Sequence, residues 1–214
     1  MRYDTVLFDL DGTLTDPGEG ITNSVAYALR QFGIENTDRT QLYKFIGPPL
    51  KESFMKFYGF SAQQAEEAVA QYRVYFAPKG MLENKVYPGV PQMLAAIRAS
   101  GRRLLVATSK PEEFAVKILE HFGLLEYFDV AAGATMDGTR VAKGDVIAYA
   151  LAQGGVTDRS RAVMVGDRLH DVQGAKAQGL DCIGVLYGYG DEAELTAAGA
   201  AYLAVSPDEV LRYL

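Results

Sequence analysis

The chain has 214 residues, a formal net charge of −6 and a single cysteine, Cys182, and these features exclude several classes of protein. Its length suits one large α/β domain or a core with a smaller insertion, and it can bury a core without disulfide bonds. The negative charge argues against a surface that coats nucleic acid, and no charge-free apolar run reaches the roughly 18 residues of a membrane span.

Short apolar segments alternate with longer amphipathic stretches along much of the chain. The short segments predict strands, because they are brief, apolar on both faces and followed by turn or polar residues. The predicted strands are residues 5–8, 103–107, 130–134, 162–165, 182–186 and 202–205. The stretches with helical spacing are residues 90–99, 112–122, 144–153, 171–178, 192–198 and 207–213. This alternation predicts an α/β fold, a doubly wound, Rossmann-like parallel sheet with helices on both faces.

One interval, residues 17–82, breaks the alternation. Its apolar residues recur at helical spacing in separate stretches, and glycine and proline turns divide these stretches from one another. We therefore predict a helical cap domain of residues 17–82, inserted after the first strand. The catalytic core domain is then formed by residues 1–16 and 83–214.

Two aspartates follow the first predicted strand, in the run Asp9-Leu10-Asp11-Gly12-Thr13. Residues two apart on an extended chain share a face, so Asp9 and Asp11 point the same way at the carboxyl end of the strand, where open parallel sheets bind ligands. Neighbouring carboxylates repel unless a cation or a shared proton relieves them, and an oxygen-rich pocket suits Mg²⁺. Taken alone, the same residues equally fit a strand whose last side chains cap a turn.

A second pair of acids follows the predicted strand 162–165. Asp167 lies at the tip of this strand, and Asp171 lies at the start of the next predicted helix. Both can converge with the first pair on one metal ion. Four acids at the ends of two strands are difficult to explain as a solvated surface, because their repulsion would be unrelieved without the ion.

Two further segments supply groups that bind phosphate. The predicted strand 103–107 is followed by Thr108 and Ser109, whose hydroxyls can donate, and the helix start that comes next offers free backbone amides to an anion. On their own, these two hydroxyls more often cap a helix. Lys143 precedes another predicted helix, where an isolated lysine is usually solvated, and only its place beside the other segments indicates a function.

In this order, the segments resemble the motifs of the haloacid dehalogenase-like (HAD) phosphatase superfamily, and the resemblance covers essentially the whole chain. The matching motifs are, in order, residues 9–13, Thr108, Lys143, and Gly166-Asp167 with Asp171. The helical insert occupies the place of this superfamily's first cap class (C1). The chain is most similar to the phosphoglycolate phosphatase-like branch, and residues 45–50 are similar to a bacterial 5′-nucleotidase-like group within it.

The resemblance implies a role for each motif. Asp9 would be the nucleophile that forms an aspartyl phosphate, and Asp11 would protonate the leaving group and then activate water. Thr108, Ser109 and Lys143 would bind the phosphate. The cofactor would be Mg²⁺, held by Asp9, Asp11 (through its backbone carbonyl), Asp167 and Asp171. Within the cap, Gly47, Lys51 and Arg73 are candidates for selecting the substrate, although most charged side chains of a cap are simply solvated.

These roles predict a Mg²⁺-dependent phosphatase of a small soluble phosphomonoester, with phosphoglycolate-like substrates favoured slightly over the nucleoside 5′-monophosphates of a 5′-nucleotidase. Inorganic pyrophosphatase and phosphomutase activities are further alternatives. The β-phosphoglucomutase-like relatives place a histidine soon after the first motif, whereas the first histidine here is His121. A non-catalytic regulatory protein is a different class, and the retention of the acids, Thr108 and Lys143 argues against it.

The expected partner is a small-molecule phosphate ester, with no nucleic acid and no membrane, and the sequence does not indicate an oligomeric state. The first residues lack the apolar stretch of a signal peptide, and a single cysteine cannot form an intrachain disulfide. Both features suit a reducing compartment, so we expect a cytoplasmic protein.

Overall fold

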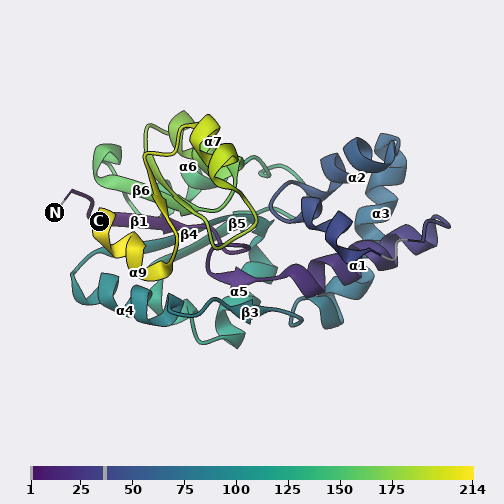
Figure 1. Cartoon of the computed structure of the whole chain (residues 1–214), viewed down its shortest axis with the longest axis horizontal. Helices are drawn as coiled ribbons and strands as arrows, with labels where there is room; N and C mark the ends of the chain where they lie inside the picture. Colours follow the sequence, from purple (N-terminus) through teal and green to yellow (C-terminus); the bar gives the residue numbers. More distant parts are fainter. Residues whose placement is uncertain (1, 36–37) are drawn as a thin grey trace. The chain divides into compact units, whose positions relative to one another are not determined.

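The computed structural model describes residues 2–35 and 38–214, which divide into two compact units (Figure 1). The larger unit comprises the residues up to Thr15 together with Val86–Leu214, and the smaller unit is Asp16–Lys85. The chain passes between the units at β2 (Thr15–Asp16) and β3 (Lys85–Val86), which pair as a two-stranded sheet.

A six-stranded sheet with the order β5-β4-β1-β6-β7-β8 forms the centre of the larger unit, and its paired strands run parallel. The strands are β1 (Thr5–Phe8), β4 (Arg103–Pro111), β5 (Val130–Ala134), β6 (Ala162–Gly166), β7 (Asp181–Val185) and β8 (Tyr202–Ala204). Numbered within this sheet alone, the order is 3-2-1-4-5-6, that of a doubly wound Rossmann sheet. The direction of winding therefore reverses between β1 and β6, and such a switch point is where ligands bind.

Helices cover both faces of this sheet (Figure 1). They are α4 (Val90–Ala99), α5 (Glu112–His121), α6 (Lys143–Gln153), α7 (Leu169–Ala177), α8 (Glu192–Ala198) and α9 (Pro207–Val210). Single 3₁₀ turns are η3 (Leu125–Tyr127), η4 (Arg159–Arg161) and η5 (Leu211–Tyr213). Helices α6 and α7 pack on one face, and α4 and α9 pack together on the other.

The core between the sheet and α6 explains why the strands are apolar on both faces. Leu7, Leu105 and Met164, from three neighbouring strands, pack against Val146 and Ile147 of α6, and all five side chains are fully buried. Burial of this apolar surface is the main favourable contribution to folding. A parallel sheet covered on both sides therefore requires the continuous apolar strands that the sequence contains.

The observed sheet and helices confirm the predicted α/β fold class, and most predicted elements agree with the structure to within one or two residues. The largest difference is in β4, which extends four residues beyond the predicted end at residue 107, to Pro111. Pairing of Pro111 with Ala134 of β5, after a shift in register beyond Ala107, continues the strand through its polar end. Cys182 is buried in the core, and burial raises the pKa of its thiol well above the usual value, as suits an inert thiol.

The smaller unit is built mainly from helices. They are α1 (Gly18–Gln31), the 3₁₀ helix η1 (Arg39–Phe45), α2 (Leu50–Tyr58), α3 (Ala62–Tyr75) and the π-helical turn η2 (Phe76–Gly80). Phe45, Phe54 and Phe60 are buried and in ring contact, and they form the aromatic centre of this unit. None of the helices in the described parts of the chain has the length and apolar character needed to cross a bilayer.

Candidate active site

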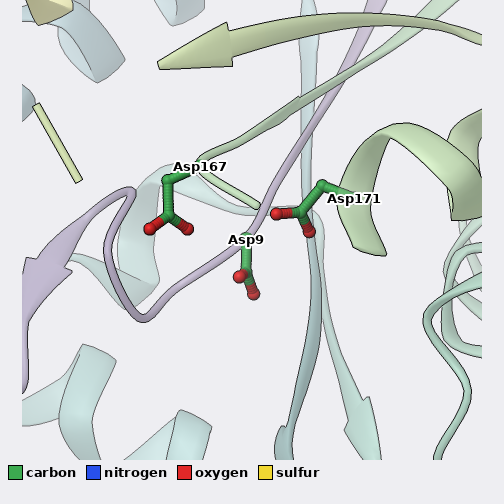
Figure 2. Close-up of side chains that lie close together, drawn as sticks. All are labelled: Asp9, Asp167 and Asp171. Atoms are coloured by element: carbon green, nitrogen blue, oxygen red, sulfur yellow. The ribbon is translucent and has the colours of Figure 1, made fainter. Parts of the chain in front are cut away.

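The carboxyl ends of β1 and β6 bring three aspartates together at the switch point of the sheet. Asp9 directly follows β1, Asp167 directly follows β6, and Asp171 lies in the first turn of α7. The register pairs Phe8 with Val165, so the two strands end side by side. One carboxylate oxygen from each aspartate lies within 4.8 Å of the other two, and Figure 2 shows the three side chains grouped around one point.

These carboxylates are almost completely shielded from solvent, with Asp9 4%, Asp167 0% and Asp171 1% exposed. Burial, together with the charges of Asp171 and Asp9, raises the pKa of Asp167 well above its usual value. Burial also raises the pKa of Asp171 to about 6, against the opposing effect of Lys143. Carboxylates held this close in an apolar surrounding repel one another, so their ionised forms require cations nearby.

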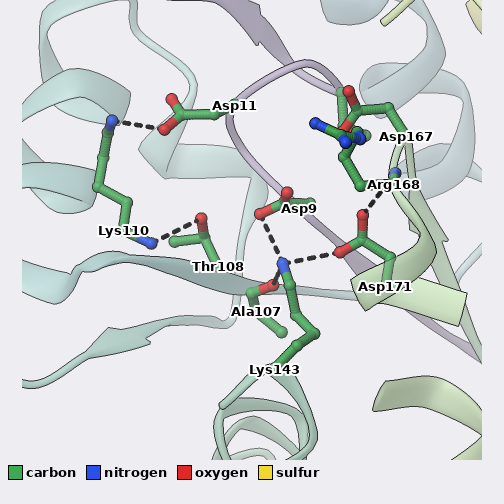
Figure 3. A network of polar contacts seen from close by, with 10 residues as sticks. Asp9, Asp11, Ala107, Thr108, Lys110, Lys143, Asp167, Arg168 and Asp171 are labelled. Carbon is green, nitrogen blue, oxygen red and sulfur yellow. Dashed lines mark hydrogen bonds and ion pairs between the residues drawn. The ribbon is translucent and has the colours of Figure 1, made fainter. Parts of the chain in front are cut away.

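Lys143, the first residue of α6, supplies one such cation. Its Nζ lies 2.8 Å from Asp9 Oδ1 and 2.8 Å from Asp171 Oδ1, and it donates a hydrogen bond of 3.0 Å to the carbonyl oxygen of Ala107 (Figure 3). Burial alone would lower the pKa of Lys143, but Asp171 and Asp9 outweigh it and raise the pKa above its usual value. The lysine is therefore charged and joins three elements of the larger unit.

Asp11 has a different cation as its partner. Its Oδ2 lies 2.5 Å from Nζ of Lys110, near the end of β4, and both residues are 8% exposed. Burial raises the pKa of Asp11, although Lys110 opposes this effect. Thr108, also buried, accepts a 3.3 Å hydrogen bond from the backbone N–H of Lys110, whereas Ser109 between them is only half-buried.

Close packing of glycines holds Asp167 in place. Gly12 has a φ of +83°, and a Cβ at this position would lie 2.1 Å from Asp167 Oδ2. A Cβ on Gly188, in the loop after β7, would lie 2.3 Å from the Gly12 carbonyl oxygen and 2.5 Å from Asp167 Cβ. The backbone N–H of Tyr189 donates a 2.8 Å hydrogen bond to Asp167 Oδ2. Only glycine fits where backbone approaches a carboxylate this closely.

A sequence model of the family described as haloacid dehalogenase-like hydrolase matches residues 6–185, most of the chain and all the residues of this buried group. The chain belongs to this family.

Similar proteins support the same assignment. This haloacid dehalogenase-like hydrolase is 48% identical over 197 residues to a 5′-nucleotidase of Pseudomonas aeruginosa, covering 92% of this chain and 89% of the relative. It is 42% identical over 207 residues to the tyrosine-protein kinase PtkA of Mycobacterium tuberculosis, and the match covers 96% of this chain and 70% of the relative. The crystal structure of a predicted phosphatase from Clostridium acetobutylicum matches with a TM-score of 0.97 at 49% identity. The match covers 100% of this chain and 98% of that one.

Most of the site residues predicted from the sequence motifs lie in one buried group in the larger unit. They are Asp9, Asp11, Thr108, Lys143, Asp167 and Asp171. Ser109 lies beside this group on the same strand. The predicted cap residues lie in the smaller unit. Gly47 precedes α2, Lys51 is exposed and pairs with Glu66 at 2.5 Å, and Arg73 is half-buried near the end of α3.

The sequence analysis missed two features of this site, Lys110 and the loop that contains Gly188 and Tyr189. The alternation of side chains along a strand could have indicated Lys110, because residues two apart share a face and Thr108 was already a candidate. No comparable local pattern indicated the loop. Its glycines carry no reactive group, and only the tertiary structure brings them against Asp167.

The ion pairs of Lys143 predict a loss of stability when this lysine is replaced. Lys143→Met should lower the free energy of unfolding by about 3–5 kcal/mol, because it leaves buried carboxylates without their cation. Urea-induced unfolding in metal-free buffer measures the change. The exposed Lys117→Met, on α5, is the matched control and should change stability by less than about 0.5 kcal/mol. An equally small change in Lys143→Met would contradict the compensating role of this lysine.

Proposed function

We propose that this haloacid dehalogenase-like hydrolase is a Mg²⁺-dependent phosphatase that transfers a phosphoryl group from a small soluble phosphomonoester to Asp9 and then to water. The observation that carries the proposal is the buried group of Asp9, Asp167 and Asp171, in which Lys143 pairs with Asp9 and Asp171. A nucleophilic carboxylate and a fixed cation at the end of a sheet strand suit attack on an anionic phosphate. The family and the phosphatase and nucleotidase names of similar proteins support the same chemistry.

The charges and donors of the site fit a divalent metal ion. The buried acids Asp9, Asp11, Asp167 and Asp171 face the ammonium groups of Lys110 and Lys143. If Asp9, Asp167 and Asp171 are ionised, Lys143 compensates one of their three negative charges and two remain. Oxygen donors with this charge suit Mg²⁺, which Asp9, the backbone carbonyl of Asp11, Asp167 and Asp171 would hold. When bound, Mg²⁺ supplies positive charge at the reacting phosphoryl group.

In the first half-reaction, a carboxylate oxygen of Asp9 attacks phosphorus and forms an acyl phosphate while the bond to the leaving group breaks. Asp11 gives its proton to the departing alkoxide, which leaves as an alcohol. The Thr108 hydroxyl can donate to a phosphoryl oxygen. Lys143 has its three N–H donors engaged by Asp9, Asp171 and Ala107, so it donates to phosphate only by releasing one of these partners.

The second half-reaction returns the enzyme to its starting state. Asp11, now a carboxylate, takes a proton from water as the water oxygen attacks phosphorus. The bond from phosphorus to Asp9 breaks, inorganic phosphate is released, and Asp9 is again a carboxylate. Asp11 therefore serves both half-reactions, once as an acid and once as a base.

The substrate class proposed here is a nucleoside 5′-monophosphate. The Pseudomonas aeruginosa 5′-nucleotidase, 48% identical, favours it over the phosphoglycolate-like substrate expected from the sequence. The likeness of residues 45–50 to a 5′-nucleotidase-like group supports the same choice. Gly47, Lys51 and Arg73 stay candidates for substrate selection, and Lys51 would have to leave Glu66 to bind an anion.

The nucleophile assignment predicts that Asp9→Asn abolishes turnover without unfolding the protein. Loss of a covalent nucleophile should lower kcat by at least about 10³-fold, as for other covalent catalysts. Steady-state hydrolysis of p-nitrophenyl phosphate measures the loss, and thermal unfolding verifies the fold. Asp208→Asn, at an exposed aspartate of α9, is the control and should keep its full rate. A variant that retained more than about a tenth of the wild-type rate would exclude Asp9 as the nucleophile.

Metal dependence is the second prediction from this mechanism. Excess chelator should abolish hydrolysis and added Mg²⁺ should restore it, whereas Ca²⁺ should inhibit, because Ca²⁺ prefers a larger and looser oxygen shell. Asp167→Ala should mimic chelation, and isothermal titration should show that this variant has lost Mg²⁺ binding. Undiminished turnover in excess chelator would refute the metal assignment.

The third prediction concerns the leaving group. The value of kcat/KM for UMP or IMP should exceed that for phosphoglycolate at least about tenfold, which corresponds to about 1.4 kcal/mol of differential binding in the transition state. Phosphate release from each compound at low concentration gives the three values under identical conditions. A higher kcat/KM for phosphoglycolate would instead favour phosphoglycolate-like substrates, and it would not contradict the phosphatase mechanism.

A further inference from the structure

Lys110 is a buried lysine that has no role in the motifs and mechanism described above. Its side chain is 5% exposed and that of its partner Asp11 is 11% exposed. Taking both charges out of water carries a desolvation penalty that their attraction offsets only in part, so such a pair is weak evidence for stability alone. Its position beside the carboxylate that moves the proton indicates a role in the reaction.

The irregular end of β4 places Lys110 at this carboxylate. The register of β4 with β5 shifts between Ala107 and Pro111, and the backbone N–H of Lys110 donates to the hydroxyl of Thr108. Thr108 and Lys110 are both buried, while Ser109 between them is only half-buried. Figure 3 shows Lys110 extending to Asp11, whereas Lys143 extends to Asp9 and Asp171.

The two oxygens of Asp11 consequently have different surroundings. Oδ2 is 2.5 Å from Nζ of Lys110, whereas Oδ1 is buried and has no hydrogen-bond partner among the described residues. An ammonium fixed on one oxygen restricts rotation of the carboxylate. It also leaves the other oxygen as the one that can exchange a proton.

We propose that Lys110 is a positioning residue for proton transfer, which holds Asp11 by Oδ2 so that Oδ1 protonates the leaving group and later deprotonates water. This inference rests on the phosphatase function proposed above. In the first step the Oδ1–H bond breaks and the proton goes to the leaving oxygen. In the second, Oδ1 takes a proton from the water whose oxygen bonds to phosphorus, and the bond from phosphorus to Asp9 breaks.

Leaving groups that differ in their need for a proton test this role. The variant Lys110→Met removes the ammonium and keeps most of the side-chain volume. Its kcat/KM should fall about tenfold or more for an alkyl phosphate, UMP or phosphoglycolate, because proton donation to an alkoxide contributes at least that much. For p-nitrophenyl phosphate the value should fall much less, because nitrophenolate leaves without a proton. The ratio kcat/KM reports only the steps up to loss of the leaving group.

A double-mutant cycle with Asp11→Asn separates positioning from a structural role. In the Asp11→Asn background, Lys110→Met should cause no further loss of kcat/KM, because Lys110 acts through Asp11. The exposed Lys117→Met is the matched control and should behave like the wild type on both substrates. If Lys110→Met does not fold, Lys110→Gln, a neutral variant with a shorter reach, should show the same selective loss.

Three results would overturn the assignment of Lys110. The Lys110 variants could keep the wild-type kcat/KM for the alkyl phosphate, or they could lose kcat/KM equally for the alkyl phosphate and for p-nitrophenyl phosphate. Lys110→Met could also lower kcat/KM as much in the Asp11→Asn background as in the wild type. The second result would make Lys110 a phosphate ligand instead. A wild-type protein without Mg²⁺-dependent turnover of any phosphomonoester would refute the proposed function itself. This result can be distinguished from a failure of the Lys110 assignment, because it is obtained with the wild-type protein alone.

Discussion

The contact on which the site depends is the ammonium of Lys143 between the carboxylates of Asp9 and Asp171. Three buried aspartates with carboxylate oxygens within 4.8 Å of one another would otherwise repel each other across an apolar interior. Lys143 relieves part of this repulsion and leaves the rest. The remaining negative charge favours the divalent cation proposed above as the cofactor.

The sheet order explains why this contact forms where it does. Strands β1 and β6 are neighbours at the switch point, and their aligned ends place Asp9 and Asp167 side by side. Glycine at positions 12 and 188 then lets two loops pack directly on Asp167. Because the two loops pack closely against Asp167, a shift of either loop would also move its carboxylate.

The parts of the site that the sequence predicts are those that follow a strand end in chain order. Asp9 and Asp167 each come directly after an apolar segment, so a local pattern locates them, whereas Lys143 is located by its place in the order of the motifs. Lys110 lies beyond the predicted end of the strand at residue 107, and pairing with β5 extends β4 to Pro111. The contact of the loop after β7 with Asp167 is likewise tertiary, and it leaves no periodic signal in the sequence.

The two lysines also explain how one short segment carries two carboxylates with different tasks. Asp9 and Asp11 are two residues apart, yet Lys143 contacts the first and Lys110 the second. Asp9 is joined through Lys143 to Asp171, which suits the nucleophile proposed at this position. Asp11 has one oxygen held and the other free of hydrogen-bond partners among the described residues, and burial raises its pKa despite Lys110. Different neighbours for similar groups are how a protein assigns a nucleophile and an acid at one pH. In this chain the two neighbours come from different elements, since Lys110 is the penultimate residue of β4 and Lys143 is the first residue of α6.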